Sequence, residues 1–129
     1  MSPGGGRARM RCEMLRVLIV DDHEGFRRMA RALLEAGGYD VVGEAGDGAS
    51  AVAAAERLRP GLVLVDVHLP DFDGFEVAAQ LNAVSSAPAV VLVSSRSESS
   101  YRRRLADSSA VGFIAKDELS SESLGQLLG

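Results

Sequence analysis

The feature of this chain that most limits its fold is a fivefold alternation of short apolar runs with segments of helical periodicity. The apolar runs have the length of β-strands and cover residues 15–20, 41–45, 62–65, 89–93 and 111–115. Short connections between such strands and helices favour a parallel sheet with right-handed crossovers. We therefore expect a single doubly wound α/β domain, a flavodoxin-like five-stranded parallel sheet of order 2-1-3-4-5 with helices on both faces.

The five intervals differ in how strongly they predict a helix. The first ends at Gly37 and Gly38, a common C-terminal signal, and the second and third begin at the N-cap candidates Asp47 and Asp73. The fourth, 97–107, has only a weak apolar stripe of Tyr101, Leu105 and Ala106 among serines and arginines and predicts a loosely held helix, while the last, 121–128, spans barely two turns. The inward-facing residues are expected to be Phe26, Met29, Ala30 and Leu33, then Val52, Ala55 and Leu58, then Val77, Ala78 and Leu81, and finally Leu124, Leu127 and Leu128.

Composition sets the domain limits and the compartment. Residues 1–14 are rich in glycine and arginine without apolar periodicity, so we expect a disordered leader, with Met10 or Met14 as alternative starts, followed by one domain over 15–129. No apolar run approaches the roughly 20 residues of a membrane span, no secretory pattern is present, and the single Cys12 cannot form an internal disulfide. The net charge of -4, with Arg102–Arg104 expected on a solvated helix face, gives no sign of a nucleic-acid surface. These features predict a cytoplasmic protein that binds neither membrane nor nucleic acid.

Polar residues end four of the five predicted strands. Asp21 and Asp22 follow the first strand, Asp66 the third, Ser94 the fourth and Lys116 the fifth. Ligands of open parallel sheets bind beyond the carboxyl ends of the strands, where the strand order reverses, and the first and third strands are neighbours at that point. We therefore expect three carboxylates, a hydroxyl and the chain's only lysine to converge at one edge.

Such a set of groups suits a metal ion and a phosphoryl group. Crowded carboxylates raise one another's pKa unless a cation lies between them, and Mg²⁺ prefers carboxylates, a main-chain carbonyl, waters and a phosphate oxygen. The ammonium of Lys116 and the hydroxyl of Ser94 remain to meet the other phosphoryl oxygens, and the carboxylate of Asp66 belongs to a type that accepts phosphoryl groups.

Each residue also has an ordinary structural explanation. Asp22 could cap the first helix, Asp66 could form a turn, Ser94 could be a solvated loop hydroxyl and Lys116 a surface lysine. Phe113 could simply belong to the core. These explanations leave unexplained why the polar residues all end strands of one sheet.

Other motifs are incomplete. The segment 71–74 echoes a calcium loop, but Leu69 and Gln80 stand where that loop needs an acidic first residue and a closing glutamate. Gly43, Gly46 and Gly48 lack the spacing of a dinucleotide-binding loop.

The segments around the polar residues resemble a known family. LIVDDHE contains Asp21 and Asp22, LVLVDVHLPDFDG contains Asp66, VVLVSS contains Ser94 and GFIAKD contains Lys116. In order and spacing these segments are similar to the response-regulator receiver domain of two-component signal transduction systems, over nearly all of 15–128. The resemblance implies a switch that is phosphorylated by a sensor histidine kinase or a phosphotransfer protein.

The resemblance also implies a metal site and an acceptor. Asp66 would take the phosphoryl group, and Asp21, Asp22 and Asp66 would hold Mg²⁺ together with the backbone carbonyl of His68. Ser94 and Lys116 would contact the phosphoryl group and assist the transfer.

The remaining implied roles concern switching. Ser94 and Phe113 would carry the conformational change, while His68 and Arg96, each two residues beyond Asp66 or Ser94, would tune the lifetime of the phosphoryl group. The partner surface, for a downstream output domain or protein, is expected on the fourth helix, fifth strand and fifth helix, and a homodimer is left open. Such a protein is a signalling module rather than a turnover enzyme.

Two other functions stay open. A pseudo-receiver would keep the fold and the partner surface without phosphorylation, although the intact acid set and Lys116 count against it. A phosphatase with an aspartyl-phosphate intermediate would need a general acid two residues after Asp66, where His68 only loosely qualifies.

Overall fold

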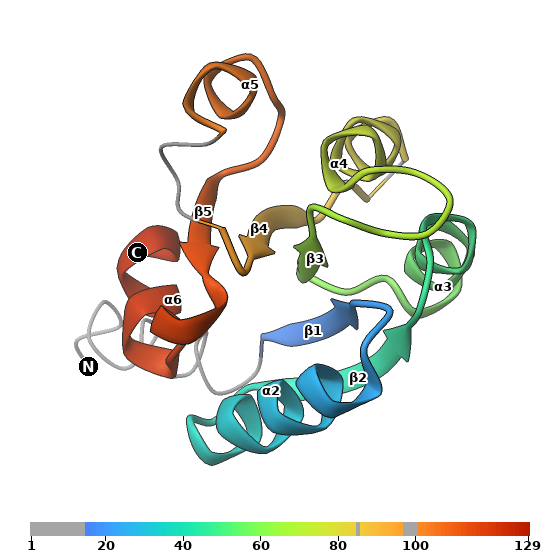
Figure 1. Cartoon of the computed structure of the whole chain (residues 1–129). Coiled ribbons are helices and arrows are strands. Elements are labelled where there is room, and N and C mark those ends of the chain that lie inside the picture. The colour runs from blue at the N-terminus through green and yellow to red at the C-terminus, as the bar shows by residue number, and fades with distance from the viewer. Residues whose placement is uncertain (1–14, 85, 97–100) are drawn as a thin grey trace, which may run out of the picture.

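The sheet of the computed structural model has the order that the sequence predicts. The structure describes residues 15–84, 86–96 and 101–129 (Figure 1), so the predicted leader and residues 97–100 of the fourth predicted helix lie outside the described residues. The five parallel strands follow the order β2-β1-β3-β4-β5. They are β1 (Arg16–Val20), β2 (Asp40–Ala45), β3 (Leu62–Asp66), β4 (Ala89–Ser94) and β5 (Gly112–Ala115). Each strand differs from its prediction at one end, so that Asp66 and Ser94 are the last residues of their strands.

The helices begin and end largely where local signals place them. They are α2 (Glu24–Ala36), α3 (Gly48–Leu58), α4 (Gly74–Asn82), α5 (Arg102–Ala106) and α6 (Ser121–Leu128), with a 3-10 turn, η2 (Lys116–Glu118). The carboxylates of Asp47 and Asp73 cap α3 and α4 by accepting the amides of Ser50 at 2.7 Å and Glu76 at 2.9 Å. Helix α2 stops before two glycines, and Gly38 has φ 95°, a conformation that favours glycine.

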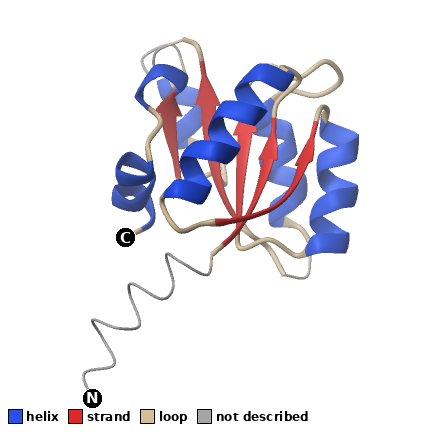
Figure 2. Cartoon of the chain, turned by 90° about the horizontal axis from the view of Figure 1, so that it is seen from below, coloured by secondary structure: helices blue, strands red, loops and turns tan. Residues whose placement is uncertain are grey.

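The sheet separates two hydrophobic cores. Alternate residues of each central strand point to opposite faces, so that Leu18 and Val63 belong to one core while Ile19 and Leu64 belong to the other. Helices α3, α4 and α5 contribute to the first core, and α2 and α6 to the second. Figure 2 shows the strands enclosed between these two layers. All of β3 is buried, which fixes its carboxyl end, Asp66, in the middle of the sheet edge.

Two predicted core positions are wrong. Met29 is 44% exposed and Leu127 is 37% exposed. On α2 the buried residues are Ala30 and Leu34, and Met29 lies roughly a third of a turn from the centre of that face. Leu127 covers the surface over Gly112, where a Cβ atom would lie 2.7 Å from its Cδ2 atom.

Within the described residues, the fourth helix leaves out Tyr101 and Asp107, which the sequence predicted to belong to it. It covers Arg102–Ala106, and none of these residues is buried, which agrees with the weak apolar stripe. The residue before it, Tyr101, is only 6% exposed and belongs to the first core. The arginines of α5 are exposed, as expected, although Arg104 also pairs with Asp73 and lies over the ring of Phe75 at 4.3 Å.

Candidate functional site

Three carboxylates gather at the carboxyl ends of β1 and β3. Asp21, Asp22, Asp66 and the ring of His23 each offer an atom, and these atoms all lie within 4.8 Å of one another. Asp21 and Asp66 are buried, whereas Asp22 and His23 are exposed. The predicted acidic cluster is therefore present. His23 was missed by the sequence analysis, and its place directly after the two aspartates was the signal that could have found it.

Asp21 is held from several directions. Its Oδ1 atom accepts the backbone N–H of His23 at 2.8 Å, and its backbone carbonyl accepts a hydrogen bond from Arg27 Nη1 at 2.6 Å. Its Oδ2 atom is buried without a well-directed hydrogen bond, but lies 2.6 Å from Lys116 Nζ. The ammonium of Lys116 therefore compensates the charge of this fully buried carboxylate.

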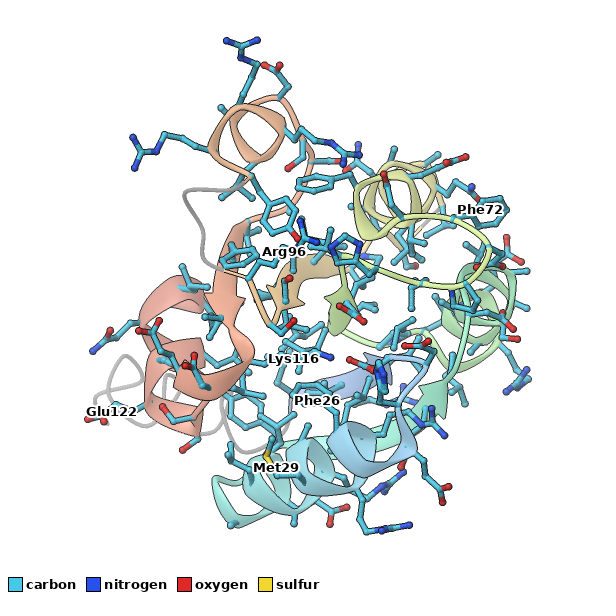
Figure 3. The ribbon with its side chains drawn as sticks, viewed as in Figure 1. Phe26, Met29, Phe72, Arg96, Lys116 and Glu122 are labelled. Atoms are coloured by element: carbon cyan, nitrogen blue, oxygen red, sulfur yellow. The ribbon has the colours of Figure 1, made fainter. Side chains whose placement is uncertain are left out.

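Lys116 lies inside the site. Its side chain is 17% exposed, and its Nζ atom is 3.7 Å from Asp66 Oδ2 as well as close to Asp21. The same atom lies 4.4 Å from the centre of the Phe26 ring, and Figure 3 shows the two side chains together between α2 and the end of β5. The alternative explanation of Lys116 as a surface lysine is wrong.

The surroundings of Asp66 disfavour the ionised form of its carboxyl group. Burial raises its pKa above the ordinary value, and the nearby charge of Asp21 raises it further. Lys116 and the backbone N–H of His68, 3.3 Å from Asp66 Oδ1, act in the opposite direction without cancelling the rise. Ionised Asp66 is therefore destabilised in the folded chain, and a cation placed among the carboxylates would stabilise the ionised form.

The donor set fits a hard divalent cation. The carboxylates of Asp21, Asp22 and Asp66 supply oxygen atoms, which Mg²⁺ prefers over nitrogen or sulfur. Asp22 does not serve the alternative role of a helix cap, because His23 occupies the N-cap position of α2. Its carboxylate instead faces the cluster, with Oδ1 3.1 Å from the Nδ1 atom of His23.

A second cluster surrounds Tyr101. The hydroxyl of Tyr101 lies 2.7 Å from His68 Nε2 and 3.2 Å from Ser94 Oγ. Ser94 is fully buried, so it is not a solvated loop hydroxyl, and its Oγ atom accepts the backbone N–H of Arg96 at 3.1 Å. The ring of Phe113 lies 5.6 Å from that of Tyr101 and is buried in the core.

The structure thus places the predicted residues in two adjoining groups. Asp21, Asp22, Asp66 and Lys116 form the charged group, and Ser94, His68 and Phe113 meet at Tyr101. Arg96 is exposed, and its contact with Ser94 is made by its backbone amide. Tyr101 was predicted only as part of an apolar stripe, because helical periodicity says nothing about a hydroxyl group.

The loop after β3 is fastened to two helices. The amide of Gly74 donates to the carbonyl of Val67 at 2.7 Å. The carboxylate of Asp71 accepts the amides of Gly48 at 2.7 Å and Ala49 at 3.0 Å, at the start of α3. These hydrogen bonds fix the conformation of the loop that follows Asp66.

Glu44 supports Asp21 indirectly, and this support should depend on pH. Its carboxylate accepts hydrogen bonds from Arg31 Nε at 2.7 Å and Arg27 Nε at 3.0 Å, and these bonds, chiefly that from Arg31, hold its pKa below the ordinary 4.5. We expect Glu44→Gln to lower the free energy of unfolding at pH 7 by only about 0.5 to 1 kcal/mol, because the ion pairs of Glu44 are partly exposed to water.

Because the pKa of Glu44 is lower in the folded chain, this stability is present above about pH 4.5 and is lost as the pH falls through the lowered pKa. Urea denaturation at several pH values measures the difference, with Glu56→Gln on the exposed side of α3 as the matched control. A difference between Glu44→Gln and the native chain that stays constant down to pH 3 would contradict the role of the charge.

Comparison with known proteins agrees with this fold and site. Residues 17–127 match the model of the response regulator receiver domain family. The chain is 35% identical over 117 residues to the transcriptional regulatory protein NarL of Mycobacterium tuberculosis, covering 90% of this chain and 54% of that protein. It is 39% identical over 101 residues to the transcriptional regulatory protein PdtaR of the same organism, covering 78% of this chain and 49% of that protein. The chain belongs to the response regulator receiver domain family.

Solved structures give the same result. The signal receiver domain of NarL from Mycobacterium tuberculosis superposes with a TM-score of 0.78 at 34% identity, covering 90% of this chain and 98% of that domain. The particular relatives are regulators of transcription, and this chain spans about half of their length. The part it matches is a receiver domain of two-component response regulators. Within the described residues, no helix has both the length and the apolar character needed to cross a membrane.

Proposed function

We propose that this chain is a phosphorylation-dependent switch in which Asp66 accepts a phosphoryl group from a phosphohistidine. The donor is a sensor histidine kinase or a phosphotransfer protein, and Mg²⁺ is the cofactor. The observation that carries the proposal is the buried carboxylate of Asp66, which is destabilised by Asp21 and lies 3.7 Å from the ammonium of Lys116. This arrangement leaves Asp66 as a nucleophile among groups that neutralise phosphoryl charge.

The transfer exchanges one bond to phosphorus for another. The bond from phosphorus to the imidazole nitrogen breaks, a bond to an Asp66 carboxylate oxygen forms, and the neutral imidazole leaves. Mg²⁺, when bound, neutralises charge on the phosphoryl oxygens. Asp21, Asp22 and Asp66 would hold that ion with the backbone carbonyl of His68, while Lys116 and Ser94 donate to phosphoryl oxygens. Attack of water on phosphorus later returns the carboxylate and releases inorganic phosphate.

Incubation with Mg²⁺ and a small phosphodonor tests the proposal. Intact mass spectrometry should show a phosphorylated species that hydroxylamine removes, as expected for an acyl phosphate, and EDTA should prevent its formation. An unmodified chain under all conditions would support the pseudo-receiver, and sustained release of many phosphates per chain would support the phosphatase.

Phosphorylation is proposed to alter a surface over α5, β5 and α6. The absence of buried residues within α5 supports this, since a helix with few buried contacts can shift at small cost. The partner is a downstream output domain or protein, as the names of the relatives suggest. We further propose that the switch acts in the cytoplasm, without touching nucleic acid itself, and that His68 and Arg96 tune the lifetime of the phosphoryl group.

Replacing Lys116 tests the proposed contact with the phosphoryl group. Lys116→Arg should lower the rate of acyl phosphate formation by about tenfold or more, because a planar guanidinium cannot reproduce a compact ammonium 2.6 Å from Asp21 and 4.4 Å from the Phe26 ring. Time-resolved mass spectrometry measures the rate. Arg28→Lys, on the exposed side of α2, is the control, and equal rates in all three proteins would remove Lys116 from the transfer.

A further inference from the structure

We infer that Tyr101 is a positioning residue of the switch, whose hydroxyl holds Ser94 and His68 in the unphosphorylated arrangement and releases Ser94 on phosphorylation. The inference rests on the proposed function. Its basis is the position of the Tyr101 hydroxyl, 3.2 Å from Ser94 Oγ and 2.7 Å from His68 Nε2. One buried hydroxyl therefore links the loop after β3 to the end of β4.

The hydrogen bonds of Ser94 explain why release is required. A serine hydroxyl has one proton to donate and two lone pairs to accept with. Ser94 Oγ already accepts the amide of Arg96 at 3.1 Å and shares a hydrogen bond with Tyr101. When the single proton of Tyr101 goes to His68 Nε2, Ser94 is the donor to Tyr101, and that bond must break before Ser94 can donate to a phosphoryl oxygen on Asp66. The bond to Tyr101 thus favours the unphosphorylated state.

Tyr101 is also the residue that fastens the start of α5. Its ring is 6% exposed and packs near the rings of Phe75 at 6.0 Å and Phe113 at 5.6 Å, whereas α5 itself buries no residue. Two residues of α5 also attach it: Leu105 packs against the first core, and the guanidinium of Arg104 lies over Phe75 and pairs with Asp73. Loss of the hydrogen bond between Tyr101 and Ser94 would therefore loosen α5 at its N-terminal end. Phe113 cannot make this connection, because its ring carries no hydrogen-bonding group.

Removal of one hydroxyl tests the inference. Tyr101→Phe keeps the ring, and the chain's other tyrosine offers the matched control, Tyr39→Phe, in the core on the opposite face of the sheet. We expect Tyr101→Phe to bind beryllofluoride with Mg²⁺ about two- to tenfold more tightly than the native chain. The variant lacks one neutral hydrogen bond that stabilises the unbound state, so binding no longer has to break it. Isothermal titration calorimetry measures this affinity, and Tyr39→Phe should leave it unchanged.

The direction of the change separates positioning from simple support of the fold. A merely structural tyrosine would weaken binding or leave it alone when its hydroxyl is removed. In a Ser94→Ala background, Tyr101→Phe should give no further gain, since the bond is already absent. Binding by Tyr101→Phe that is equal to or weaker than that of Tyr39→Phe overturns the inference.

A measurement without ligand distinguishes this inference from the proposed function. Hydrogen exchange of the Arg96 amide and of Arg102–Ala106 should be several-fold faster in Tyr101→Phe than in Tyr39→Phe. Equal exchange in the two variants overturns the role of Tyr101. If the native chain fails to bind beryllofluoride while exchange in Tyr101→Phe is faster, the proposed function fails and the hold of Tyr101 on Ser94 stands.

Discussion

Asp66→Asn should reduce acyl phosphate formation to background, a loss of about a hundredfold or more, since the amide offers no nucleophilic carboxylate oxygen at the end of β3. Intact mass spectrometry after incubation with Mg²⁺ and a small phosphodonor measures the modified fraction. Asp40→Asn is the matched control. It replaces an exposed aspartate at the start of β2, at the edge of the sheet opposite the site, and should leave the modified fraction unchanged. An equal modified fraction in Asp66→Asn and the native chain would assign the phosphoryl group to another residue.

The same substitution should stabilise the chain in EDTA. Burial and the charge of Asp21 destabilise ionised Asp66, so removing its charge should raise the free energy of unfolding by on the order of 1 kcal/mol. Mg²⁺ should then raise the unfolding temperature of the native chain more than that of Asp66→Asn. A variant that unfolds at lower temperature than the native chain in EDTA would mean that Lys116 more than balances the repulsion.

Gly74→Ala should lower the free energy of unfolding by about 2 to 3 kcal/mol, which is the upper part of the range for adding atoms to a site that is already packed. A Cβ atom on Gly74 would lie 2.6 Å from the carbonyl oxygen of Asp66 and 2.9 Å from the Cα atom of Val67. Both are backbone atoms at the end of a fully buried strand, so neither can move without shifting Asp66. The rate of acyl phosphate formation should therefore fall together with the stability.

Urea denaturation of Gly74→Ala and of a matched glycine variant measures this effect. At Gly125 in α6 a Cβ atom would meet nothing within 4 Å, and Gly125→Ala should stabilise the chain by about 0.5 to 1 kcal/mol. If Gly74→Ala unfolds like Gly125→Ala, the loop after β3 relaxes more freely than the packing of Gly74 indicates.

The fold was predictable because its signals are local and repeated. Each strand follows from a short apolar run, and the caps of Asp47 and Asp73 mark the starts of two helices. The charged part of the site was predictable for a related reason. In a parallel sheet the residues that end neighbouring strands meet, so positions along the chain were enough to place Asp66 near Asp21 and Lys116.

What could not be predicted depends on tertiary placement. Nothing local indicates that Tyr101 reaches His68, 33 residues away, or that Lys116 lies nearer to Asp21 than to Asp66. The exposure of Met29 depends on which part of α2 the sheet covers, and an apolar pattern gives that face only to within about one position. The roles of the site residues in phosphoryl transfer stay predictions.

Because the sheet divides the interior into two cores, substitutions in one core can change the stability of the chain with little effect on residues in the other. Tyr101, Phe113 and Phe75 all lie in the core on the side of α3 and α4, while Ala30, Leu34 and Leu124 fill the core beneath α2 and α6. Substitutions at distant sites without shared partners usually add independently. Repacking around Ala30 and Leu34, beneath α2, is thus the place to gain thermal resistance with little effect on the response, whereas Leu124 lies under α6, which belongs to the surface proposed to respond.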